Sequence, residues 1–133
     1  SRMSVPKSPG LYLVTLNNSE PISVNAHDPR VAEKAIKVTR SNIKLGKAKN
    51  LASRLKNYEK TFGVENVNFR PLLVTDDIQA AEKVVLACVD QYRIRGRTGR
   101  KNEWLEGIEP AMAVEMLFDA LDHAGINYQN LST

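Results

Sequence analysis

Residues that form covalent or metal cross-links are scarce in this sequence of 133 residues. Cysteine occurs once, at Cys88, so no internal disulfide framework can form, and a reducing compartment such as the cytoplasm is expected. Cys88 falls in an apolar helical run, which favours a small core residue over a nucleophile. The two histidines, His27 and His123, lie far apart without a partner at metal-ligand spacing, so a zinc site is not expected.

Long hydrophobic runs are missing as well. No apolar segment approaches the length of a transmembrane helix, and the N-terminus has no secretory signal pattern, so no membrane partner is expected. Internal repeats, low-complexity tracts and interdomain linkers do not occur either. The length suits one domain over 10–125, with an insertion at about 21–38, an N-terminal arm 1–9 and a C-terminal tail 126–133.

The composition is close to average except for an excess of basic over acidic residues. The formal net charge is +4 and the isoelectric point is about 9.3, whereas the hydrophobic fraction of 42% and the charged fraction of 26% are near the average for globular proteins. This basic balance is compatible with a polyanionic partner such as a nucleic acid, but does not require one.

The most informative stretch predicts a strand followed by a helix. Apolar and charged residues alternate over 43–46, which predicts a half-buried strand, and Gly46 is expected to end it in a tight turn. A helix is predicted over 50–62, with Asn50 as its N-cap and Gly63 just beyond its C-terminal end. Its apolar face consists of Leu51, Leu55, Tyr58 and Phe62.

Cations accompany this strand and helix. Arg54 lies one position from the apolar face of the helix, and Lys47 directly follows Gly46. A guanidinium fixed beside such a lysine is suited to binding a phosphate, because arginine offers a bidentate fork that stays protonated. The alternative is that these residues, with Lys49, form a solvated charged face.

Further elements are expected on both sides of this stretch. The first strand covers 11–16, and a short return strand covers 22–24. A short helix is expected to open at Asp28-Pro29, where Asp can cap and Pro can occupy the first position. Another strand covers 68–75, in which Pro71 indicates an edge position or a bulge.

Two more helices and a basic loop complete the chain. One helix is capped by Asp76 or Asp77, and the last lies between Pro110 and Gly125. Between them, the segment 93–101 is expected to be a loop with two glycines and five cations. The order of elements favours an α+β fold, in which a small antiparallel three-stranded sheet is flanked by helices.

Four short motifs, in this order, resemble the GIY-YIG nuclease superfamily. Gly10-Leu11-Tyr12 stands where that family has Gly-Ile-Tyr, and Lys44-Leu45-Gly46 stands where it has Tyr-Ile-Gly. Arg54 corresponds to the arginine in the following helix, and Ala80-Ala81-Glu82-Lys83 to the later helix that supplies the metal-binding glutamate. The resemblance spans about residues 10–120.

A phage-associated branch of the superfamily is more similar still. Its second motif reads aliphatic-Lys-aliphatic-Gly-Lys, as Ile43 to Lys47 does here, and a basic loop leads to a motif similar to Glu103-Trp104-Leu105. Two features depart from the superfamily pattern. The tyrosine of the second motif is absent, with Lys44 or Ile43 in its place, and the spacing between Tyr12 and Gly46 is longer than usual.

The resemblance implies a divalent-metal-dependent DNA endonuclease that uses Mg²⁺ or Mn²⁺ and is GIY-YIG-like in fold. Glu82 would hold the metal, and Arg54 would stabilise the charge that develops on the phosphate. Lys47 would support the phosphate or lower the pKa of a neighbouring tyrosine. Tyr12 would accept a proton from the attacking water if nearby cations lowered its pKa.

Each residue also has a purely structural interpretation. Glu82 could pair with a lysine one turn away on a solvated helix face, and Tyr12 could be a core residue. Glu103 could be a helix-start or loop carboxylate, and Trp104 is expected to be a core anchor.

Nucleic-acid contacts are expected from the basic residues near the second motif and in the loop, namely Lys44, Lys49, Arg95, Arg97, Arg100 and Lys101. A flexible solvated loop is the alternative. At the level of function, the alternatives are a catalytically inactive nucleic-acid-binding module on the same scaffold and a small interaction domain. A homodimer would let a single site cut both strands, but the sequence shows no interface for it.

Overall fold

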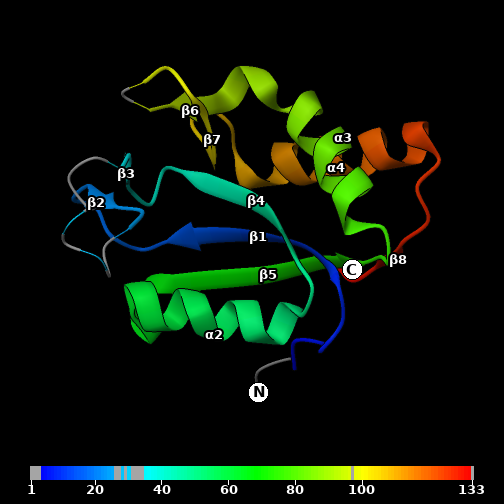
Figure 1. The fold of residues 1–133 in the computed structure, drawn as a ribbon, viewed down its shortest axis with the longest axis horizontal. Coiled ribbons are helices and arrows are strands. Elements are labelled where there is room, and N and C mark those ends of the chain that lie inside the picture. The colour runs from blue at the N-terminus through cyan, green and yellow to red at the C-terminus, as the bar shows by residue number, and fades with distance from the viewer. Residues whose placement is uncertain (1–3, 26–27, 29, 31–34, 97, 133) are drawn as a thin grey trace.

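A mixed sheet-and-helix architecture organises the chain, with one helix on one face of a sheet and two helices on the other (Figure 1). The computed structural model describes residues 4–25, 28, 30, 35–96 and 98–132. Its strands are β1 (Gly10–Leu16), β2 (Ile22–Ser23), β3 (Lys37–Val38), β4 (Ile43–Ala48), β5 (Val67–Val74), β6 (Arg93–Arg95), β7 (Lys101–Leu105) and β8 (Gln129–Asn130). Its helices are α2 (Leu51–Phe62), α3 (Ile78–Cys88) and α4 (Pro110–Ala124), with short 3-10 turns at Val64–Asn66 and Asp90–Tyr92.

The main sheet has six antiparallel strands in the order β6-β7-β4-β1-β5-β8, and β2 and β3 pair separately. The expectation of a three-stranded sheet was therefore wrong. Its three strands are present as β4-β1-β5, and the hairpin β6–β7 and strand β8 extend them at the two edges. The segment 93–101, expected to be a loop, contains β6 and the first residue of β7. Strands of two to five residues are too short to show a clear alternating pattern, so the sequence did not reveal them.

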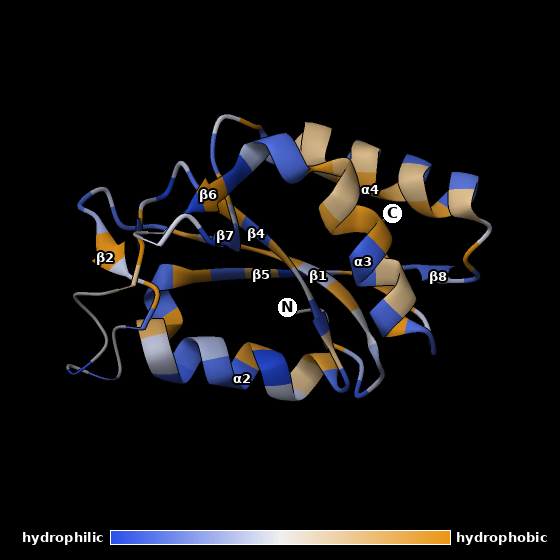
Figure 2. Ribbon diagram, turned by 45° about the horizontal axis from the view of Figure 1, so that its top comes forward, coloured by the Kyte–Doolittle hydropathy of each residue, from blue (hydrophilic) through white to orange (hydrophobic). Residues whose placement is uncertain are grey.

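Strand β1 divides the hydrophobic interior into two cores because its side chains alternate between the two faces of the sheet. Leu11 and Leu13 join the core beneath α3 and α4, whereas Tyr12, Val14 and Leu16 join the core beneath α2. Figure 2 shows mostly hydrophobic residues along α3 and α4 and many hydrophilic residues along α2. The α2 side is therefore the more polar side of the molecule.

The helix ends follow their local signals. The side chain of Asn50 accepts a hydrogen bond from the Ser53 backbone N–H over 3.1 Å, as expected for an N-cap. Asp77, one of the two expected caps, accepts from the Ala80 N–H. Gly125 ends α4 in the left-handed conformation, with φ of 72°. These boundaries were predictable because each depends on neighbouring residues.

The structure also bears on the expectations for Pro71, for Cys88 and for the short helix at Asp28-Pro29. Pro71 does lie at a bulge, because Tyr12 pairs with Pro71 while Leu11 pairs with Leu73. Cys88 is half-buried, and its thiol lies 3.7 Å from the Met116 carbonyl oxygen. The helix expected to open at Asp28-Pro29 falls largely outside the described residues. None of the described helices is long and apolar enough to span a membrane.

Gly46 does not end its strand, contrary to expectation. Strand β4 continues to Ala48, and Gly46 lies opposite Tyr12 of β1. A Cβ atom at Gly46 would lie 2.4 Å from the Tyr12 hydroxyl oxygen and 2.6 Å from its Cζ atom. The glycine is required because the tyrosine ring occupies the space that any side chain would fill.

We predict that Gly46→Ala destabilises the protein by roughly 1–3 kcal/mol, because the ring must move out of a packed core. The change in unfolding free energy can be measured by chemical denaturation. Gly96→Ala is the matched control, since a Cβ there would come no closer than 3.6 Å to its nearest contact. An equal cost for Gly46→Ala in the wild-type and Tyr12→Leu backgrounds would contradict this explanation.

Candidate active site

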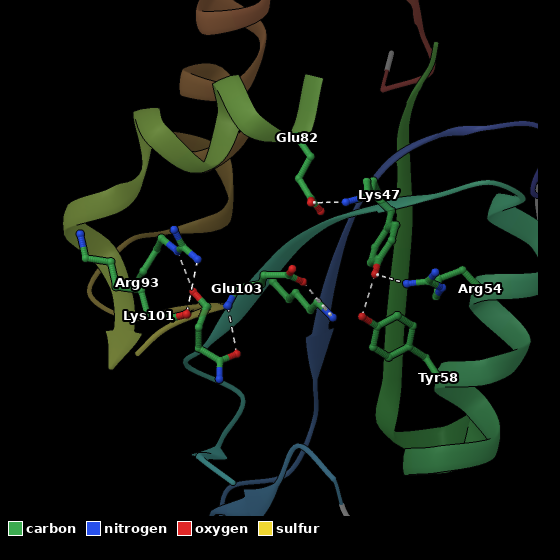
Figure 3. A network of polar contacts seen from close by, with 10 residues as sticks. Lys47, Arg54, Tyr58, Glu82, Arg93, Lys101 and Glu103 are labelled. Carbon is green, nitrogen blue, oxygen red and sulfur yellow. Dashed lines mark hydrogen bonds and ion pairs between the residues drawn. The ribbon is translucent and has the colours of Figure 1, made fainter. Parts of the chain in front are cut away.

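Three side chains form a hydrogen-bonded cluster on the α2 side of the sheet. The hydroxyls of Tyr12 and Tyr58 lie 2.8 Å apart, and the Arg54 Nη1 atom donates to the Tyr12 hydroxyl over 3.3 Å. Arg54 and Tyr58 are one helical turn apart on α2, so both reach the same point on β1 (Figure 3). The cluster holds the guanidinium in a defined position.

Aromatic packing fixes the cluster. The ring of Tyr12 is fully buried and stacks on Phe69 of β5 with a centroid distance of 4.8 Å. Tyr58 meets Tyr12 edge-to-face at 5.6 Å, the arrangement that aromatic pairs prefer. The structure thus gives Tyr12 the core position that the sequence left as an alternative, while its hydroxyl still contacts Arg54.

The pKa values of both tyrosines are raised. Burial is the main cause of the raised pKa of Tyr12, and it outweighs the opposing effects of Lys44 and Arg54. Burial likewise raises the pKa of Tyr58 to about 12, against the hydrogen bond from Tyr12. Lys44 and Arg54 do act to lower the pKa of Tyr12, but burial outweighs them, so the lowered pKa that a base role for Tyr12 requires is not present in the free protein. Both hydroxyls are neutral at physiological pH.

Lys44 of β4 lies close to the tyrosine pair. Its Nζ atom lies 5.3 Å from the centroid of the Tyr58 ring and 3.6 Å from the Glu103 Oε2 atom. The Lys44 side chain is only 18% exposed, whereas that of Glu103 is 42% exposed. Lys44 is therefore a partly buried residue beside the tyrosine pair rather than a free surface cation.

Lys47 and Glu82 form the second contact between predicted site residues. The Lys47 Nζ atom lies 2.8 Å from the Glu82 Oε1 atom, and Figure 3 shows the two side chains pointing toward each other from β4 and α3. Glu82 is a buried residue, and its side chain is 11% exposed. In the purely structural interpretation, Glu82 was expected to pair with a lysine one turn away on its own helix. Its partner is instead Lys47, which belongs to strand β4 of the sheet.

One side chain from each of the two contacts lines a hollow of about 290 Å³. These are Lys47, the partner of Glu82, and Arg54, the partner of Tyr12, whereas Glu82 and Tyr12 themselves do not line it. We call it the α2–α3 hollow, and its lining residues are Lys47, Lys49, Asn50, Ser53, Arg54, Asn57, Ile78 and Gln79. A second hollow, of about 240 Å³, continues along α2 and shares Arg54 and Asn57 with the first. Three cations on one polar opening suit it to an anionic ligand.

The metal chemistry available here is limited. No group of three or more His, Cys, Asp or Glu side chains is placed to hold a metal among the residues that the structure describes. Glu82 offers one carboxylate, and its partner Lys47 is a flexible side chain that can move away. This donor set fits Mg²⁺, which keeps several waters and uses one or two carboxylates at phosphate sites.

The cations of the β6–β7 hairpin divide into two groups. Lys101 and Arg93 both pair with Asp90, and Arg93 also donates to the Asn102 carbonyl oxygen over 2.8 Å. The hydrogen bond from Lys101 is the main cause that lowers the pKa of Asp90. Arg95 and Arg100 are exposed, and Arg97 lies outside the described residues. Lys101, expected to bind nucleic acid, therefore also has a structural contact.

Sequence reasoning assigned Tyr58 to the core and left Glu103 open, yet both contact predicted site residues. Tyr58 lies four residues after Arg54, and this spacing on one helix face was the available signal. The signal for Glu103 was the motif Glu103-Trp104-Leu105 after the basic loop, but that motif did not indicate the partner, because Lys44 lies far away in sequence. Trp104, as expected, is buried in the core beneath α2.

Comparison with known proteins identifies a family. The model of the family described as the T5orf172 domain matches residues 23–123. Lys47, Arg54 and Glu82 lie within the matched residues, whereas Tyr12 precedes them. No curated protein and no solved structure matches the chain.

We predict that Tyr12 and Tyr58 ionise only well above the ordinary tyrosine pKa of 10.0. In an absorbance titration, Tyr12→Phe and Tyr58→Phe should leave the rise near pH 10 unchanged and remove amplitude at higher pH. Because the folded pKa values are raised, the associated stability is complete below the unfolded pKa of about 10 and is lost as pH rises through the folded values. Urea-unfolded protein is the control. Amplitude lost near pH 10 in either folded variant would contradict the prediction.

Proposed function

The chain belongs to the T5orf172 domain family, and on that premise we propose that it is a divalent-metal-dependent DNA endonuclease of the GIY-YIG type. This family is a phage-associated domain that is compatible with a nuclease. The GIY-YIG assignment rests on the motif order and on the positions of Arg54, Lys47 and Glu82. The observation that carries the proposal is the α2–α3 hollow, where Arg54 and Lys47 face one opening and Lys47 contacts Glu82.

Phosphodiester hydrolysis requires stabilisation of the charge that develops on the phosphorus-bound oxygens. Arg54 is suited to this role, because the Tyr12 hydroxyl orients its guanidinium and the hollow leaves room for a phosphate beside it. Lys47 would supply a second cation to the same phosphate. Preorganised groups of this kind act without the cost of reorientation during the reaction.

Glu82 would hold the Mg²⁺ or Mn²⁺, and the bound metal would supply Lewis-acid activation of the phosphate and water. The tyrosines would have a different role, because their hydroxyls are protonated in the free protein and burial moves their pKa values further from physiological pH. Neutral Tyr12 would act through Arg54, because its buried hydroxyl accepts a hydrogen bond from the guanidinium and does not line the hollow. For Tyr12 to act as a general base, substrate binding would first have to lower its pKa.

A nucleic-acid-binding module without catalysis is the second candidate. The observations that favour it are the missing second-motif tyrosine, the raised pKa of Tyr12 and the engagement of Glu82 by Lys47. This candidate expects DNA binding without cleavage by a well-folded protein. Both candidates use the same polar opening along α2.

Metal-dependent nicking of supercoiled plasmid tests the proposal. With Mg²⁺ or Mn²⁺ present, we predict that Glu82→Ala and Arg54→Ala each reduce the nicking rate about 100-fold or more, the usual cost of removing a group that stabilises a transition state. Glu115→Ala on the exposed side of α4 is the matched carboxylate control and should nick normally. Folding of each variant is checked by circular dichroism.

Two results would contradict the proposal, the first in part and the second as a whole. Unchanged nicking by Glu82→Ala would refute Glu82 as the metal ligand but leave an endonuclease. A folded wild-type protein that binds DNA but does not nick it with either metal would favour the binding module.

The exposed arginines of the hairpin should form part of the DNA footprint. We predict that Arg95→Gln and Arg100→Gln each lower the slope of log affinity against log salt by about 0.9, the value for one lost phosphate contact. Lys60→Gln, at an exposed lysine in the last turn of α2, is the control for charge removal elsewhere. Slopes that match this control would exclude the hairpin from the footprint.

A further inference from the structure

We propose that Lys47 is an internal competitor for the metal at Glu82, and that phosphate binding in the α2–α3 hollow releases this competition. The inference rests on the proposed function, because it assumes that Glu82 is the metal ligand. It goes further by making metal binding and nucleic-acid binding mutually dependent through one lysine. Lys47 would then alternate between a carboxylate in the free protein and a phosphate in the complex.

The geometry of the pair supports the first half of this inference. The Lys47 Nζ atom lies 2.8 Å from Glu82 Oε1, a charge-assisted hydrogen bond. The Glu82 side chain is 11% exposed, so water gives it little compensation, whereas Lys47 is 32% exposed. A divalent cation and an ammonium group cannot both occupy this site at close range, because like charges repel strongly where water is scarce.

The position of Lys47 in the hollow supports the second half. Lys47 lies on the sheet between Glu82 of α3 and the opening that Arg54 lines from α2. Its four-carbon side chain can rotate without any movement of β4. A phosphate held by Arg54 would therefore attract the Lys47 ammonium away from Glu82 and leave that carboxylate available to a metal.

Weak metal binding makes such competition effective. One carboxylate gives Mg²⁺ or Mn²⁺ few protein ligands, so an internal ammonium group can change the observed affinity substantially. Coupling between two ligands is reciprocal. Removing the Lys47 charge should therefore tighten metal binding, and removing the Glu82 charge should tighten metal-free DNA binding.

The first measurement is Mn²⁺ binding to the full chain, followed by electron paramagnetic resonance without nucleic acid. Lys47→Met should bind Mn²⁺ about fivefold tighter than wild type, consistent with the loss of a partly buried charge-assisted contact. Lys49→Met is the matched control, because Lys49 lines the same hollow and carries the same charge, and its affinity should change by less than about twofold. Glu82→Gln should abolish this binding.

The second measurement is binding of a short DNA duplex in EDTA, where no cleavage occurs. Glu82→Gln should bind about fivefold tighter than wild type, because Lys47 is released toward the phosphate. Glu115→Gln, which removes an exposed carboxylate on α4, should bind within about twofold of wild type. In the Lys47→Met background, Glu82→Gln should give no gain.

The outcomes separate this inference from the proposed function. If Glu82→Gln abolishes Mn²⁺ binding but Lys47→Met binds no tighter than Lys49→Met, the competition is refuted and the metal site stands. If Glu82→Gln binds Mn²⁺ as wild type does, Glu82 is not the metal ligand, and both the competition and the assigned role of Glu82 are refuted.

Discussion

The packing of Tyr12 against Gly46 is the constraint on which the rest of the site depends. The ring fills the space above the glycine, stacks on Phe69 and places its hydroxyl 2.8 Å from that of Tyr58. Because Tyr58 belongs to α2, this contact positions the helix on the sheet, and Arg54 one turn earlier is positioned with it. Packing in the core beneath α2 thus determines where the guanidinium meets the hollow.

Strand β4 distributes charge to both faces of the sheet. Its alternation directs Lys44 toward Tyr58 and Glu103, and Lys47 toward Glu82 of α3. Each lysine therefore meets a carboxylate that comes from another element. Pairing of this kind leaves fewer cations available to bind a phosphate. The exposed cations, and those that can leave their carboxylate, therefore matter more for nucleic-acid affinity than the net charge of +4. Under the proposed function, a phosphate would have to displace a carboxylate from each of these lysines, so affinity would depend on the carboxylates as well as on the lysines.

Local signals in the sequence were sufficient for most of the fold. The Asn50 cap and the Gly125 stop were predictable because a cap or stop involves residues within one turn. The central strands were predictable because alternation extends over several residues. The hairpin β6–β7 and strand β8 were not, since short strands at a sheet edge form where a neighbouring strand offers hydrogen bonds, and that neighbour is distant in sequence. Gly46 was recognised as special, but its reason is the ring of Tyr12 on another strand rather than a turn.

The sequence by itself determined the candidate chemistry of this protein, because the motif residues Arg54, Lys47 and Glu82 could be identified by type and order. It also determined that α2 would bury one face and carry Arg54 beside that face. Tertiary structure alone decided the partners: Tyr12 for Arg54, and Lys47 for Glu82. It also decided the direction of the tyrosine pKa shifts, because burial depends on how α2 and β5 cover the sheet, whereas the neighbouring cations that suggested a lower pKa were visible in the sequence.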